Sequence, residues 1–155
     1  MMSSTSTPLS RQSQRLLQVG AALLLYSFLE GFAIPYVGSP RIGLSVHTLS
    51  ALQAVLLLAS GLVWPRLALG PTSAHLAFWF LIYSAVAILA AYTVAAISGV
   101  GIETIALMGE LPHGLAQGTP FQEGVIRVIA YSSASGLISF SLILWGLITD
   151  RPTAG

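Results

Sequence analysis

Two ionisable side chains, His47 and Glu30, lie within otherwise apolar stretches of the chain. An ionisable group at the centre of a bilayer costs about 3 kcal/mol or more, so such residues are functional candidates by default. Imidazole can hydrogen-bond to a neighbouring helix, carry a proton or ligate a metal. A carboxylate at this depth can pair with a cation or bind a proton. These two residues are therefore where chemistry is expected first.

Small residues dominate the helical face that carries His47. At steps of three and four positions along this face lie Ser50, Ala51, Ala54, Leu58 and Gly61. Such a groove suits a neighbouring helix, or a flat cofactor ligated by the imidazole and seated on Ala51 and Ala54. The residues alone favour a neutral, hydrogen-bonded structural histidine and leave haem ligation as the alternative.

Glu30 has two interpretations. It lies near the end of the first apolar segment, where it can pair with Arg41 as an interfacial acid. The alternative is the cation-binding carboxylate of a small four-span exporter, although the chain is long for such a protein. His75 and His113 are placed near an interface and in a loop, and both are treated as surface residues.

Three further polar side chains fall within the apolar segments. Gln53 points about 120° away from His47 around a helix, so both can border one pocket only between helices. Tyr83 and Tyr92 carry phenol groups that need hydrogen-bond partners in hydrocarbon. Packing is the default role for each tyrosine, and helix contact is the alternative for Gln53.

The elements that must position these residues are four apolar helices. The chain has 155 residues, 55% hydrophobic and 7% charged, far below the roughly 25% charged residues of a soluble domain. Each apolar segment is long enough for the ~20 residues of a membrane span. The sequence predicts an all-α fold, an integral membrane four-helix bundle, with tails at residues 1–15 and 149–155 and spans at about residues 16–34, 44–64, 75–100 and 125–148.

Composition also excludes several function classes. The net charge is +1, from six arginines against five acids, without the basic cluster that nucleic acid requires. Cysteine is absent, which excludes thiolate catalysis, disulfide exchange and iron–sulfur clusters. The paired intramembrane histidines of a bis-haem cytochrome are also missing. The partners expected instead are the lipid bilayer and small hydrophobic molecules.

Arginines and tryptophans predict the orientation. With a cytoplasmic N-terminus, four arginines lie inside and two, Arg41 and Arg127, lie outside. All three tryptophans then fall near the inner interface. Both termini are therefore predicted to be cytoplasmic, in a bacterial inner membrane, with the acidic loop 101–124 outside. Small residues spaced by four in the last span, such as Ser135 and Ser139, favour helix packing or a homo-oligomer over a polar substrate lining.

Two motifs carry a resemblance to a known family. They are SPRIGLSVH at residues 39–47, followed by GLVWP at 61–65, and GTPFQEG at 118–124. With four spans in the same order, the chain resembles the hydroxylaminobenzene mutases and the related styrene oxide isomerases over about residues 15–148. The motifs make Arg41, Gln122 and Glu123 further candidate site residues.

The resemblance implies a specific chemistry. In the related isomerase a histidine of the second helix binds haem b, whose ferric iron acts as a Lewis acid without net redox change, and His47 matches that histidine. Tyr92 matches a tyrosine that positions substrate. The implied reactions are arylhydroxylamine to aminophenol, first, and epoxide to aldehyde, second. The resemblance also suggests a trimer.

Departures from the family pattern concern the substrate. Val19, Gln53 and Ile88 stand where family members tend to have His, Asn and Asn. A more apolar pocket could favour an epoxide over an arylhydroxylamine, or a different reaction. The exporter using Glu30, and a purely structural membrane protein, are the expectations from other classes.

Overall fold

The computed structural model describes residues 8–98 and 119–149 as helices joined by short turns. The helices are α1 (Pro8–Ala33), η1 (Ile34–Tyr36), α2 (Pro40–Val63), η2 (Trp64–Arg66), α3 (Pro71–Ser98), α4 (Pro120–Ser132), η4 (Ser133–Ser135) and α5 (Gly136–Thr149). Each of the four long segments begins at a proline, whose missing N–H falls where a helix has no internal acceptor. The described part of the chain is all-α, as predicted.

Four segments of the described chain are long and apolar enough to cross a membrane: Pro8–Tyr36, Pro40–Arg66, Pro71–Ser98 and Pro120–Thr149. They fit an integral membrane protein. Large apolar side chains point outward, with Phe32 80% and Leu137 73% exposed. Outward apolar side chains are what a helix needs when its surroundings are lipid rather than water.

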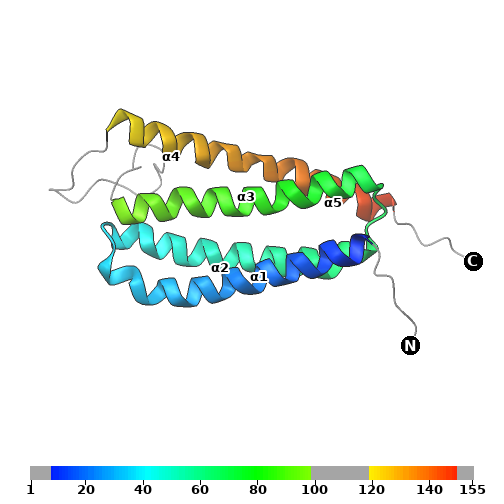
Figure 1. Cartoon of the computed structure of the whole chain (residues 1–155), viewed down its shortest axis with the longest axis horizontal. Helices are drawn as coiled ribbons and strands as arrows, with labels where there is room; N and C mark the ends of the chain where they lie inside the picture. The colour runs from blue at the N-terminus through cyan, green and yellow to red at the C-terminus, as the bar shows by residue number, and fades with distance from the viewer. Residues whose placement is uncertain (1–7, 99–118, 150–155) are drawn as a thin grey trace, which may run out of the picture.

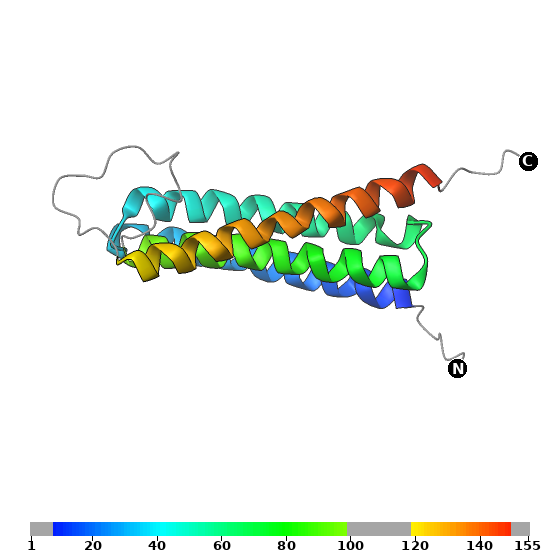
Figure 2. The same cartoon turned by 90° about the horizontal axis from the view of Figure 1, so that it is seen from above.

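Neighbouring segments along the chain pack on one another in order. α1 lies against α2, α2 against α3, and α3 against the fourth segment, as Figure 1 shows. In Figure 2 the fourth segment crosses the others obliquely. α1 begins and α5 ends at one end of the bundle, and α2 and α4 begin at the opposite end. Below, these are the "α1-start end" and the "α2-start end".

The first helix starts earlier than expected. Residues 8–15, assigned to a polar tail from the sequence, form the first two turns of α1. Their polar side chains find partners on α2 and η2: the Ser13 hydroxyl donates to the Gly61 carbonyl oxygen at 2.7 Å. The Trp64 Nε1 likewise donates to the Gln12 Oε1 at 3.0 Å. These bonds let a polar sequence continue the helix.

The fourth segment, expected as a span at about residues 125–148, extends over Pro120–Thr149. It begins at Pro120 and is interrupted by the 3₁₀ turn at Ser133–Ser135. The small residues after this turn pack against α3, since a Cβ on Gly136 would collide with Ser84. The Ser139 hydroxyl donates to the Ala77 carbonyl oxygen at 2.7 Å. Within the described chain, these small residues serve helix packing.

The tryptophans share one end of the bundle. Trp64 and Trp79 both stack edge-on against Phe78, and Trp145 is next to Gly146, which packs on Leu69. Arg11, Arg15 and Arg66 lie at this same α1-start end, and Arg41 and Arg127 lie at the other. The grouping is the one the sequence predicted. The side of the membrane that each end faces stays a prediction, and Arg151 lies outside the described residues.

Glycines let α1 and α2 approach closely. A Cβ on Gly20 would lie 2.9 Å from Leu58 Cγ and 3.0 Å from the Ala54 carbonyl oxygen. A Cβ on Gly61 would lie 3.0 Å from the Leu17 side chain. In lipid, such close backbone contact supplies much of the packing energy between helices.

The first prediction concerns this contact. Gly20→Ala should destabilise the bundle by about 1–3 kcal/mol because the new methyl group meets backbone atoms that cannot move independently. Thermal unfolding in detergent measures the change. Gly124→Ala is the matched control: a Cβ there meets nothing within 4 Å, so stability should stay equal or rise. Equal melting temperatures for both variants would contradict the close approach.

Candidate functional site

Hydrogen bonds in both directions join His47 of α2 to Ser27 of α1. The His47 Nδ1 lies 2.8 Å from the Ser27 main-chain carbonyl oxygen. The Ser27 hydroxyl donates to the His47 carbonyl oxygen at 2.9 Å. Because a carbonyl oxygen can only accept, the neutral ring carries its proton on Nδ1, and Nε2 keeps a lone pair. The contacts between α1 and α2 thus orient the imidazole and use only Nδ1, so Nε2 can bind a ligand.

Gly31 and Glu30 of α1 also lie against the His47 ring. Together with Ser27 they form what we call the seat of the imidazole. A Cβ on Gly31 would lie 3.2 Å from both Cε1 and Nδ1 of His47, so the ring rests on the glycine. The Glu30 Oε2 lies 3.8 Å from the His47 Nδ1. This oxygen is buried without a hydrogen-bond partner among the described residues, and the Glu30 side chain is 9% exposed. Ser27, Glu30 and Gly31 occupy one helical face, at steps of three and four.

The position of Glu30 corrects one sequence expectation. The acid was expected to pair with Arg41, but the ion-pair contact that it makes in the described chain is with His47. Arg41 is exposed in the first turn of α2. The carboxylate therefore belongs to the surroundings of the imidazole.

Tyr92 lies in the same third of the bundle. It packs against a buried cluster that contains Val46, the neighbour of His47, together with Ile126 of α4. No described hydrogen bond joins Tyr92 to His47. Nearby, the Tyr26 hydroxyl of α1 and the Thr93 hydroxyl of α3 lie 3.1 Å apart and link those helices. Tyr92 thus packs on the cluster that contains the neighbour of His47, and no hydrogen bond among the described residues joins the Tyr92 and His47 side chains.

The small-residue groove around His47 is largely filled by α1. Ala54 is fully buried, and its carbonyl oxygen lies beside Gly20 of α1. It therefore contributes to helix packing rather than to an open surface. Ala51 and Gln53 are half-buried. His47 itself keeps 34% of its side chain exposed. The accessible part of the site is therefore the ring, and not the length of the groove.

The motif segments at residues 39–47 and 119–124 are helix starts at the α2-start end of the bundle, whereas residues 61–65 end α2 at the α1-start end. Thr119 caps α4: its hydroxyl accepts from the Gln122 N–H, and the Gln122 side chain accepts from the Thr119 N–H at 2.9 Å. This reciprocal capping box gives Gln122 a structural role. Glu123, in the same first turn, is buried. In the other motif the Ser39 N–H donates to the Ala96 carbonyl oxygen at 2.9 Å, which ties the start of α2 to the end of α3.

His47, with Ser27, Glu30 and Gly31 around its ring, has the chemistry of a single axial ligand to a haem. The described chain holds no group of three or more His, Asp or Glu that could bind a bare metal ion. A porphyrin supplies four ligands of its own and needs one protein nitrogen, such as an imidazole Nε2. A ligating histidine usually donates its other N–H to a carbonyl or carboxylate, as the His47 Nδ1 does to Ser27. The donor set therefore suits haem better than a bare metal ion.

Sequence reasoning missed Ser27, Gly31, Tyr26 and Thr93. A signal for two of them was present, because Ser27 and Gly31 flank Glu30 on one face of an apolar helix. Small and polar residues that share such a face are typical of a contact with another polar group. The residue on α2 that they contact depends on how the two helices are aligned.

Comparisons with known proteins agree on one relationship. The family model described as styrene oxide isomerase matches residues 12–148. Hydroxylaminobenzene mutase HabB of Ectopseudomonas oleovorans is 41% identical over 160 aligned positions, which cover 98% of this chain and 93% of the relative. Hydroxylaminobenzene mutase HabA of the same organism is 29% identical, over 81% of this chain and 90% of the relative. No solved structure matches the chain.

The second prediction tests the seat of the imidazole. In protein with ¹⁵N-labelled histidine, NMR should show His47 protonated on Nδ1, with the signal assigned by its loss in His47→Gln. Ser27→Ala should preserve this tautomer because the acceptor is a main-chain oxygen. Gly31→Val should disturb it, since its side chain would displace the ring. An Nε2-protonated ring in the unaltered protein would contradict the geometry.

Proposed function

Because the chain belongs to the styrene oxide isomerase family, we propose that it is a membrane-embedded isomerase that rearranges arylhydroxylamines to aminophenols. The observation that carries the proposal is the similarity to a hydroxylaminobenzene mutase over nearly the whole length of both chains. Mutase or isomerase chemistry is common to both relatives and to the family model. The apolar helices suit a substrate that arrives from the bilayer.

The reaction balances without an external oxidant or reductant. The N–O bond of the hydroxylamine breaks, and a C–O bond forms on the aromatic ring. A ring proton is lost and the nitrogen regains one, so substrate and product contain the same atoms. A catalyst must therefore polarise the N–O bond and move protons, while no electrons leave the substrate.

We assign His47 as the residue that holds haem b, through Nε2. When bound, ferric haem supplies a Lewis acid for the oxygen of the substrate. The support in this chain is the Nδ1–H···O bond to Ser27, which leaves Nε2 unprotonated and aims the ring. Gly31 gives the ring room, and any larger residue would push it aside.

Glu30 is a positioning residue in this proposal. Its buried oxygen offers the His47 N–H a second acceptor 3.8 Å away, so a small rotation of the ring exchanges one partner for the other. Carboxylate and carbonyl partners both raise the basicity of a ligating imidazole. The exporter role of Glu30 lacks this support, because the carboxylate faces His47 and the family is one of isomerases.

Tyr92 and Gln53 are the candidates for contact with substrate. Tyr92 is half-buried in the apolar cluster beside Val46, where a phenol O–H can orient a small aromatic molecule. Gln53 is half-buried on α2, six residues after His47. In apolar surroundings charge that develops on the substrate is poorly screened, so one donated hydrogen bond has a large effect.

Epoxide to aldehyde rearrangement is the second candidate, favoured by the description of the family model. It needs the same Lewis acid on a strained C–O bond. Val19 and Ile88, apolar where the family pattern tends to be polar, are compatible with it. A homo-oligomeric assembly, a trimer, belongs to the same proposal.

The third prediction concerns the cofactor. Protein purified with haem available should show a Soret band that His47→Ala abolishes, because that change removes the only proposed protein ligand. His75→Ala is the matched control and should keep the band, since that histidine lies at the opposite end of the bundle. An unaltered protein without a Soret band, or an unchanged band in His47→Ala, would reject haem on His47.

The fourth prediction separates the two reactions. Protein in nanodiscs is supplied with phenylhydroxylamine and, separately, with styrene oxide, and products are followed by chromatography. We expect kcat/KM for phenylhydroxylamine, measured as aminophenol formed, to be at least about tenfold above kcat/KM for styrene oxide, measured as phenylacetaldehyde formed. Tenfold corresponds to about 1.4 kcal/mol in transition-state free energy. The reverse ratio would favour the epoxide isomerase. Turnover of neither substrate would reject both.

A further inference from the structure

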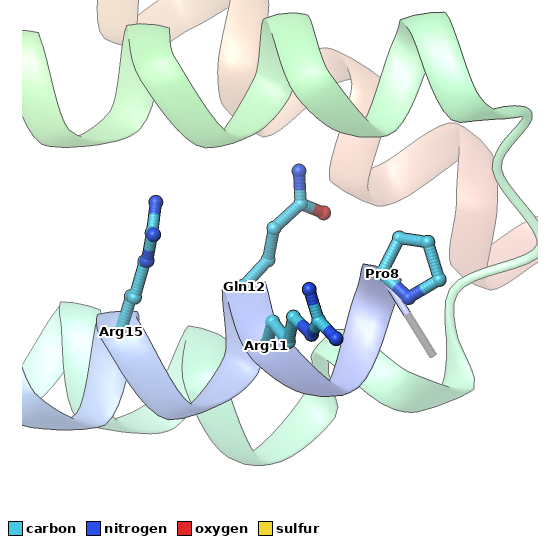
Figure 3. Close-up of a pocket in the computed structure, with 4 residues that line it drawn as sticks. All are labelled: Pro8, Arg11, Gln12 and Arg15. Atoms are coloured by element: carbon cyan, nitrogen blue, oxygen red, sulfur yellow. The ribbon is translucent and has the colours of Figure 1, made fainter. Parts of the chain in front are cut away.

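Two adjoining hollows lie at the α1-start end of the bundle, far from His47. The first, of about 360 Å³, is lined by Pro8, Arg11, Gln12 and Arg15 and is shown in Figure 3. The second, of about 640 Å³, lies between the first turns of α1 and α3 and shares Pro8 and Gln12 with the first. Along α2, Trp64 at this end is about 25 Å from His47. The hollows are therefore separate from the proposed reaction site.

The first hollow offers hydrogen-bond donors and positive charge. Arg11 and Arg15 are one helical turn apart on α1, and both line it. Gln12 lies between them, and Figure 3 shows its amide nitrogen extended in the same direction as Arg15. The Gln12 Oε1 is held by the Nε1 of the fully buried Trp64, so the amide orientation is fixed. Guanidinium groups and an amide N–H together suit the oxygens of a phosphate.

Among the described residues, the charged side chains at this end of the bundle are all arginines. Arg66 lies at the same end, in the turn η2. The carboxylates of the described chain, Glu30 and Glu123, are both near the opposite end. Along α1, Glu30 is about 28 Å from Arg11. Within the described residues, an anion bound here would meet arginines and no neighbouring acid.

The second hollow is mainly apolar. Its lining includes Leu9 of α1, Leu69 of the α2–α3 turn, and Leu76 of α3. Its volume falls within the ~300–1,000 Å³ of sites that take small ligands. Because it adjoins the arginine hollow, a ligand with an anionic head and an apolar tail would occupy both. α1 packs mainly on α2, so such a ligand would also bridge α1 to α3.

We propose that the two hollows form a binding site for an anionic phospholipid, with the phosphate on Arg11, Arg15 and Gln12 and an acyl chain between α1 and α3. The depth is suitable, because the exposed Trp79 and Trp145 place this end of the bundle at a membrane interface. Lipid is favoured over free phosphate because an apolar hollow continues directly from the charged one. The proposal is independent of haem and of the reaction catalysed.

The test is native mass spectrometry of the full chain in detergent, titrated with phosphatidylglycerol or phosphatidylcholine. The unaltered protein should bind phosphatidylglycerol more tightly. Arg11→Gln/Arg15→Gln should weaken that binding about 30-fold, as expected for two arginines near an anionic headgroup. Arg41→Gln/Arg127→Gln is the matched control at the opposite end and should leave it unchanged. Equal loss in both double variants, or equal binding of the two lipids, would overturn the proposal.

A second arm tests the apolar hollow and the source of the phosphate. Thr72→Trp places an indole in the second hollow and should weaken phosphatidylglycerol binding, whereas Ser98→Trp, at the other end of α3, should not. Inorganic phosphate at millimolar concentration should not displace the lipid; displacement would show a free-phosphate site and overturn the lipid proposal. If a variant fails to fold, the comparison of the two lipids on the unaltered protein still decides.

Discussion

The close approach of α1 and α2 is the constraint on which the rest of the structure depends. A helix pair in lipid gains little from the hydrophobic effect, so it must be held by van der Waals contact and by hydrogen bonds between helices. Gly20 and Gly61 provide the contact, and Ser13 and Ser27 provide the bonds. Without this approach Ser27 and Gly31 would not reach His47. The same packing that stabilises the pair therefore builds the candidate site.

The Ser27–His47 pairing links packing to chemistry. The His47 Nδ1 donates to the Ser27 carbonyl oxygen, and the Ser27 hydroxyl donates to the His47 carbonyl oxygen. One ring nitrogen of His47, Nε2, takes no part in this pairing. An imidazole held in this way loses little conformational entropy when it binds a ligand, because its tautomer and orientation are already set. Glu30 adds a buried oxygen beside the same N–H. A histidine with a fixed orientation is what the proposed ligand role of His47 requires.

The two ends of the bundle have different characters. The α2-start end holds His47, Glu30, Tyr92 and the motif segments at residues 39–47 and 119–124, which form helix starts and caps. The α1-start end holds three arginines and the tryptophans, together with the two hollows. This separation places the proposed chemistry away from the proposed lipid site. It follows from where the polar residues fall on four helices of alternating direction.

Hydropathy and residue type were enough to predict four apolar helices and their order, and to select His47 as a candidate site residue. Such features are local, because the cost of placing a residue in lipid is a property of that residue and its neighbours along the chain. The sequence could not show that Glu30 faces His47 rather than Arg41, that Ala54 is covered by α1, or that Gln122 caps a helix. It also could not select Ser27 and Gly31 as the seat of the ring. Contacts across helices depend on the rotation and axial alignment of one helix against another, and only the packing of the whole bundle determines them.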